Sequence, residues 1–97
     1  MKIIKGDSFL LALVAKVDGV PQDLTGWDVR SSIQLGQALK PLTVDVTDMA
    51  TGEYLLSADT SDWPTGVHKF DIRYTTDAGQ VLTTEAISVQ VARGVTP

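Results

Sequence analysis

Apolar and polar residues alternate along most of this chain, and a period of two residues predicts β-strands. From Trp27 to Leu35, every second side chain is apolar or small, and the residues between them are polar. The same alternation runs from His68 to Tyr74. Each of these two segments is therefore expected to form a strand with one face buried and the other in water.

The segment from Ser8 to Val17 has a different pattern, because apolar residues occupy both of its faces. One face carries Phe9, Leu11 and Leu13, and the other carries Leu10 and Val14. Strands that are buried on both faces show such near-continuous apolar runs. The pattern predicts a central strand that is covered on both sides for part of its length.

Turn signals separate these segments at intervals of roughly 8–12 residues. Asp18-Gly19 predicts a tight turn, and Thr76 to Gly79 predicts a hairpin loop with glycine at a positive φ. Gly36 to Pro41 is expected to be a loop, and Asp59 to Gly66 a corner between two strands.

Three further strands are expected between these turns. Val44 and Val46 mark a short strand that stops at Asp48, and Glu53 to Ser57 is a strand with Tyr54 facing inward. The last strand is expected to run from Gln80 to about Ala92, with its apolar positions in a single register from Val81 onward.

About seven short strands and no helical period predict an all-β fold, an immunoglobulin-like antiparallel β-sandwich. A small β-barrel is the alternative if the shorter strands merge. The 97 residues are expected to form a single domain, residues 1–97. The predicted core consists of Leu11, Leu13, Trp27, Val29, Ile33, Val44, Tyr54, Leu56, Phe70, Ile72, Val89 and Val91.

Composition removes several classes of function. The chain has no cysteine, which excludes disulfides, thiolate nucleophiles and cysteine-bound zinc. The net charge is −4, and lysine and arginine are scattered, so nucleic acid is not an expected partner. No apolar run is long enough to cross a membrane or to act as a signal-peptide core. The protein is therefore expected to be made in the cytoplasm without contact with a membrane.

The only histidine, His68, is the one candidate for a catalytic base. Ser61, Asp59 and Asp62 are close to it in sequence, so the residue types needed for a Ser-His-Asp triad are present. However, His68 is in phase with Phe70 along its strand, and there is no G-x-S-x-G elbow. We interpret His68 as structural, and we assign no catalytic residue and no enzymatic activity.

Carboxylates border two of the predicted turns: Asp45, Asp48 and Glu53 at one, and Asp59 and Asp62 at the other. Aspartate caps turns through its own side chain, which explains Asp48 and Asp62 without a ligand. No spacing matches a calcium loop, although weak calcium binding is the alternative. We predict no cofactor and assign no metal-binding residue.

Trp63 has two interpretations. It either plugs one end of the sandwich against Leu24 and Trp27, or it stays exposed as an anchor for a partner.

Two long segments of the chain resemble immunoglobulin-like domains of tailed-phage structural proteins. These are "KGDSFLLALVAKVDGVPQDLTGWDVRSSIQ" (residues 5–34) and "TGEYLLSADTSDWPTGVHKFDIRYTTDAGQVLTTEAISVQVARGVT" (residues 51–96). The distinctive parts are Asp23-Leu24-Thr25-Gly26 and the Trp63-Pro64-x-Gly66 corner. The pattern is similar to the N-terminal domain of phage baseplate upper proteins and to small tail-associated proteins.

The resemblance implies a non-enzymatic virion component, synthesised in the bacterial host cytoplasm, that helps to build a tail, baseplate or fibre attachment. Its expected partners are other phage structural proteins or a second copy of itself. Longer members of the family also contain a coiled coil or a receptor-binding part, which these 97 residues lack, so the position in the particle is left open.

Sandwich edges are the expected contact surfaces, because unpaired backbone groups there accept another strand. Met1 to Lys5 is a candidate edge or swapped arm, and Val89 to Val95 is a second candidate edge. The candidate partner contacts are Ile3, Ile4, Trp63 and Val91. The alternative function is a carbohydrate- or cell-surface-binding module, in which Trp63, Asp62 and Asp59 would contact the glycan.

Overall fold

The computed structural model describes residues 1–94, and these residues form strands, turns and loops without a helix. The strands are β1 (Lys2–Ile4), β2 (Ser8–Val14), β3 (Lys16–Val17), β4 (Val20–Pro21), β5 (Asp28–Leu35), β6 (Ala38–Asp48), β7 (Glu53–Asp59), β8 (Gly66–Thr75), β9 (Val81–Thr83) and β10 (Ile87–Ala92).

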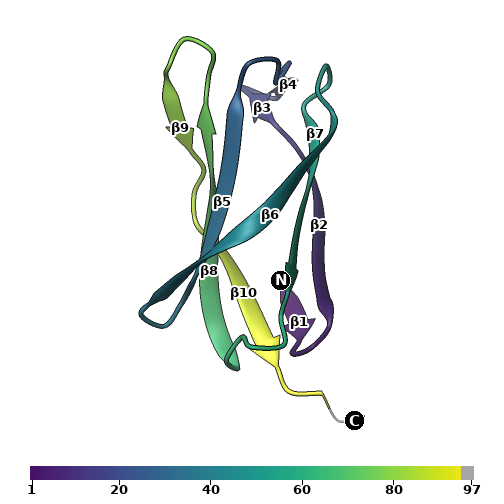
Figure 1. Cartoon of the computed structure of the whole chain (residues 1–97), viewed down its shortest axis with the longest axis vertical. Helices are drawn as coiled ribbons and strands as arrows, with labels where there is room; N and C mark the ends of the chain where they lie inside the picture. Colours follow the sequence, from purple (N-terminus) through teal and green to yellow (C-terminus); the bar gives the residue numbers. More distant parts are fainter. Residues whose placement is uncertain (95–97) are drawn as a thin grey trace.

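The strands form two packed layers that share β6. Hydrogen-bonded neighbours follow the order β1-β10-β8-β5-β6-β7-β2, with β9 paired to β8 and a separate β3–β4 hairpin. The first part of β6, up to Leu42, pairs with β5, and the part from Thr43 pairs with β7. Figure 1 shows β6 crossing diagonally from one layer to the other. We call β1, β10, β8, β9, β5 and the start of β6 the larger layer, and the rest of β6, β7 and β2 the smaller layer.

The order of strands in each layer is that of an immunoglobulin-like sandwich. In that fold, the third, sixth and seventh strands are neighbours in one sheet, while the second, fifth and fourth are neighbours in the other. Here β5, β8 and β10 take the first set of places, and β2, β7 and β6 take the second. The sheet curls most of the way round, but the described strands β1 and β2 at its two ends do not pair with each other. The sandwich prediction is therefore confirmed.

Several turns agree with the sequence prediction. Asp18 and Gly19 have positive φ values of 52° and 79° and join β3 to β4 as a two-residue hairpin. Two positive φ values are what a type I′ turn requires. Gly79 also has a positive φ, in the loop that joins β8 to β9.

The predicted loop from Gly36 to Pro41 is wrong. Gly36 and Gln37 alone make the turn, and β6 begins at Ala38, which pairs with Leu35. Pro41 belongs to this strand although it has no backbone N–H to donate. It is tolerated because the start of β6 pairs only with β5, which leaves its other side free.

The last predicted strand is interrupted. Thr83 pairs with Arg73, whereas Ile87 pairs with Phe70, so the β9–β10 segment contains one residue more than the opposing part of β8. Thr84 fills the irregularity: its Oγ1 accepts a hydrogen bond from the Ile72 amide at 3.0 Å. This β-bulge places Val81 and Thr83 on the exposed face, so the prediction of a single register is wrong.

The core lies between the two layers. Of the predicted core residues, seven are buried, namely Ile33, Tyr54, Leu56, Phe70, Ile72, Val89 and Val91, and the other five are partly buried against them. The predicted core lacks the buried side chains of Phe9, Ala15, Leu24, Leu35, Leu42 and Trp63, although burial of Trp63 beside Leu24 was one of its two interpretations.

Candidate functional site

One free edge of the sheet is formed by β2. This strand lies at the end of the smaller layer, and among residues 1–94 it pairs only with β7. On its outer face, Leu10 is 67% exposed, Val14 is 39% exposed, and Ala12 between them is also exposed. The prediction that this segment is a central strand covered on both sides is wrong, because its outer face lies in solvent.

The inner face of β2 is also incompletely covered. Phe9 is buried, but Leu11 and Leu13 are only half-buried, although they point toward the core. Side chains in the middle of a sheet are covered by neighbours on both sides. Leu11 and Leu13 have a neighbouring strand on the β7 side alone, so their partial exposure marks an open margin of the core.

The backbone of β2 offers hydrogen-bonding groups along this margin. The Ala15 amide donates to Gly52 O at 2.9 Å, on the β7 side. Because successive residues of a strand point their N–H and C=O groups to opposite sides, Leu13, Leu11 and Phe9 also bond toward β7. The N–H and C=O groups of Ser8, Leu10, Ala12 and Val14 therefore face the free edge.

Met1 to Lys5 was predicted to be an edge or a swapped arm, and its strand β1 is an edge strand of the sheet that pairs within the chain. β1 runs parallel to β10, with Ile3 opposite Val91, and the Gln90 amide donates to Met1 O at 2.8 Å. Ile3 and Ile4 are half-buried, and Ile3 packs against the core. β1 is thus the last strand of the larger layer rather than a loose arm.

The second predicted edge, Val89 to Val95, is wrong for its described residues. β10 pairs with β8 on one side and with β1 on the other, so it is an inner strand. Val91 is 2% exposed and is a core residue, so its side chain cannot contact a partner. Val95 lies outside the described residues.

Trp63 is a core residue and not an exposed anchor. It is 1% exposed, and its ring lies 5.6 Å from that of Phe9. The predicted neighbours are wrong as well. Trp63 lies just before the start of β8, at Gly66. Trp27 lies next to Asp28, which pairs with Thr75 at the end of β8. The two tryptophans therefore lie at opposite ends of the sandwich.

The hydrogen bonds around His68 fit a structural role. Its Nε2 lies 2.8 Å from Pro64 O, which ties β8 to the corner. Asp59 accepts the Ser61 amide at 2.9 Å, and Asp62 pairs with Lys40. Within residues 1–94, neither carboxylate bonds to His68. The turn is capped by Asp59, and not by Asp62 as predicted.

Two exposed carboxylates, Asp62 and Asp23, have lowered pKa values. The hydrogen bond and ion pair with Lys40 hold the pKa of Asp62 below its usual range. Asp23 accepts both the hydroxyl and the amide of Thr25, at 2.6 and 2.9 Å, and these bonds lower its pKa. Both groups have structural partners, which explains the shifts without a ligand.

Residues 1–94 contain no group of three or more histidine, aspartate or glutamate side chains placed to hold a metal ion. No helix in this part of the chain is suitable for spanning a membrane.

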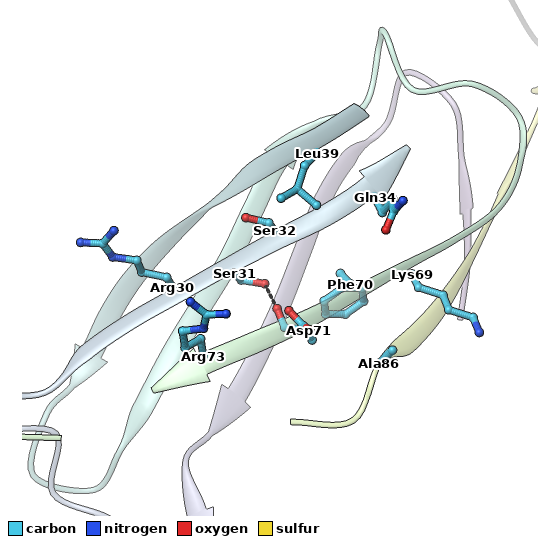
Figure 2. A pocket seen from close by; sticks show the side chains of 10 residues that line it. All are labelled: Arg30, Ser31, Ser32, Gln34, Leu39, Lys69, Phe70, Asp71, Arg73 and Ala86. Carbon is cyan, nitrogen blue, oxygen red and sulfur yellow. Dashed lines mark hydrogen bonds between the residues drawn. The ribbon is translucent and has the colours of Figure 1, made fainter. Parts of the chain in front are cut away.

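A polar hollow of about 460 Å³ lies on the outer face of the larger layer. Figure 2 shows Arg30 and Lys69 extending to opposite sides of it. Arg30 and Arg73 are direct cross-strand neighbours, and Arg30 forms an exposed ion pair with Asp28 at 2.7 Å. Such a hollow offers hydrogen-bond donors to a polar ligand. Its other polar side chains are Ser31, Ser32, Gln34 and Asp71.

Sequence reasoning found neither the β2 edge nor this hollow. The hollow could have been inferred from the polar positions of β5 and β8, because these residues are cross-strand neighbours, as Ser32 and Asp71 are. The signal for the edge is the absence of charge from Ser8 to Ala15, which also fits a covered strand.

Comparison with known proteins adds a distant structural likeness. No protein-family model and no curated protein matches the chain. A solved structure of murine CRIg is similar with a TM-score of 0.47 and 10% identity, covering 96% of this chain and 92% of that chain. A match at this level carries no information on function.

Proposed function

We propose that this protein is a non-enzymatic structural or assembly module of a bacteriophage or prophage particle, and that it acts through protein–protein contacts. The observation that carries the proposal is the free edge of β2, which is apolar on its outer face and unpaired in its backbone. The resemblance of residues 5–34 and 51–96 to tailed-phage domains supplies the context of a tail, baseplate or fibre attachment.

The physical basis of such a role is strand addition. An exposed edge presents a row of N–H and C=O groups that a neighbouring subunit can extend. Proteins that remain alone protect their edges with charges, prolines or bulges. From Ser8 to Val14, β2 contains no charged residue and no proline, and its register with β7 is unbroken.

A binding role also agrees with the chemistry of the described side chains. His68 is bonded to a backbone carbonyl, and the neighbouring carboxylates have other partners. A general base or nucleophile needs a reactive partner within hydrogen-bonding distance. These contacts support a non-enzymatic function.

Mass spectrometry of purified particles from the host that encodes this chain tests the proposal. The expected result is that the protein copurifies with intact tails or baseplates in a fixed ratio to a known structural protein. If it stays in the soluble host fraction while complete particles form, the proposal is wrong.

The second candidate is a carbohydrate-binding module, and the observation that favours it is the polar hollow. The predicted glycan site at the corner is not supported, because Trp63 is buried. In the hollow, Arg73, Ser32 and Gln34 supply the hydrogen-bonding groups. A glycan array tests this candidate: binding that is lost in Arg73→Ala supports it, and an array without signal removes it.

A further inference from the structure

We propose that two copies of this chain associate through β2, with the two β2 strands antiparallel and the smaller layers joined into one continuous sheet. The inference rests on the proposed function, since it names the partner of the same edge. It is nevertheless tested separately, because self-association is measured on the isolated protein and particle assembly is not.

The two edge strands of the sheet differ in how they are protected against pairing with another chain. β1, at one end, has only three residues, begins at Lys2 and is followed by Lys5. Short strands and lysines are the usual devices that prevent edge pairing. β2, at the other end, has seven residues and lacks such a device. In Figure 1 it lies at the right-hand margin, with no strand beyond it.

The backbone limits the possible registers. The outward groups belong to Ser8, Leu10, Ala12 and Val14, so these residues must form the hydrogen-bonded pairs of a new antiparallel ladder. Pairing over the full length of β2 then places Leu10 opposite Ala12 of the second copy, and Ser8 opposite Val14. Leu11 faces Leu11 of the second copy on the twofold axis.

The side chains are complementary in this register. On the outer face, each large Leu10 lies beside a small Ala12, so the two faces meet without a steric conflict. On the inner face, the half-buried Leu11 and Leu13 gain the neighbouring strand that they lack in one copy. Phe9 lies opposite Leu13 and extends the apolar contact.

The charges that flank β2 are also complementary, and they favour a second copy as the occupant. Asp7 precedes the strand and Lys16 follows it closely, and both are exposed. Neither side chain has an ion-pair partner among the described residues. In the antiparallel arrangement, the end of β2 that is preceded by Asp7 in one copy lies beside the end that is followed by Lys16 in the other. Opposite charges are therefore placed at the same end of the joined strands, and the twofold axis repeats this arrangement at the other end.

The first test is sedimentation of the full chain over a range of concentrations. We expect a reversible dimer whose dissociation constant rises at least about a hundredfold in Leu10→Lys, since two lysines are brought into an apolar contact. Leu39→Lys is the matched control, because Leu39 is 70% exposed and lies on β6, away from β2. It should leave the dimer unchanged.

The second test uses charge reversal to identify the orientation. Asp7→Lys and Lys16→Asp should each weaken the dimer by about tenfold, since at both ends of the interface an attraction between surface charges becomes a repulsion. The double variant should associate as the wild type does, because the attraction is restored with opposite sign. Reversing Glu85 and Lys69, both exposed and distant from β2 in sequence, is the control.

A wild-type protein that stays monomeric at every concentration overturns the proposal, and so does a dimer that Leu10→Lys leaves intact. If both single reversals weaken a dimer that the double variant does not restore, the antiparallel β2 register is wrong.

Discussion

At the scale of single residues, the corner between β7 and β8 shows how polar and apolar contacts cooperate. Trp63 fills the core beside Phe9, while Thr60, which is fully buried, bonds to the turn before β2. The Thr60 hydroxyl donates to Asp7 O at 2.6 Å and accepts the Gly6 amide at 2.9 Å. The corner is therefore a structural joint between the layers.

Replacing Trp63 by alanine tests this role. The change removes a buried ring, and it should lower the free energy of unfolding by about 3–5 kcal/mol. Urea denaturation measures the loss. Leu39→Ala, at an exposed site, should change stability by less than about 0.5 kcal/mol. A comparable effect of the two variants would mean that Trp63 is not a core residue.

Gly52 illustrates a close backbone approach. It has a φ of +76°, and a Cβ atom at this position would lie 2.5 Å from Gln22 O. Gly79 has a similar φ of +85°, but a Cβ atom there would meet nothing within 4 Å. Gly79→Ala should cost only the backbone strain, about 1–2 kcal/mol.

Gly52→Ala should cost clearly more than Gly79→Ala, because the backbone around Gln22 must also move. Thermal or chemical unfolding of both variants measures the difference. Equal costs would contradict the predicted contact.

Tyr54 and Tyr74 make the stability depend on alkaline pH. Their hydroxyl oxygens lie 2.5 Å apart. Burial and this bond raise the pKa of Tyr54 above its ordinary value, and burial raises the pKa of Tyr74. Because the folded state retains these protons more firmly, the stabilisation is complete below about pH 10, the pKa of tyrosine in an unfolded chain, and is lost as the pH rises above it.

Unfolding experiments between neutral and alkaline pH should show a steeper loss of stability in the wild type than in Tyr54→Phe, which lacks one of the two groups. Identical slopes would show that Tyr54 does not contribute.

At the scale of elements, the sequence predicted strands well where one face is polar. β5 and β8 were recognised with their inward residues because polar side chains alternate with apolar ones. The same reasoning failed for β2, since an apolar outer face indicates either a covered strand or an exposed edge. Periodicity reports the chemistry of a face and not what covers it.

Register was harder to predict than strand identity. The additional residue at the bulge moves each side chain of β9 to the opposite face of the sheet. A single register therefore predicts Val81 and Thr83 on the buried face, whereas they are exposed. Likewise, Pro41 suggested a loop, and only the pairing of β6 on one side at that point explains its place in a strand.

Deleting residues 1–5 separates the contributions of the two edges. β1 covers one side of β10 and packs Ile3 on the core, so its removal should lower stability. Self-association should persist, because β2 lies at the other end of the sheet. Sedimentation and urea denaturation of the truncated chain measure both effects. Loss of the dimer in a protein that remains folded would assign association to β1.

At the scale of the whole molecule, the two edge strands of the sandwich, β1 and β2, differ in length and charge. One edge is a short strand that begins at Lys2 and is followed by Lys5, and the other is a longer strand without charged residues. The net charge of −4 gives two copies a general repulsion, while Asp7 before β2 and Lys16 after it favour an antiparallel approach along this edge. In the proposed dimer, the module joins its second copy through the β2 edge alone.

Amide hydrogen exchange along β2, followed by NMR at low and high protein concentration, tests the central claim most directly. The amides of Leu10 and Ala12 should exchange rapidly in the monomer, because they face the free edge, and should become protected as the concentration rises. The Leu11 amide, bonded toward β7, should be protected throughout. If Leu10 and Ala12 exchange equally fast at all concentrations, β2 is not the edge through which this protein associates.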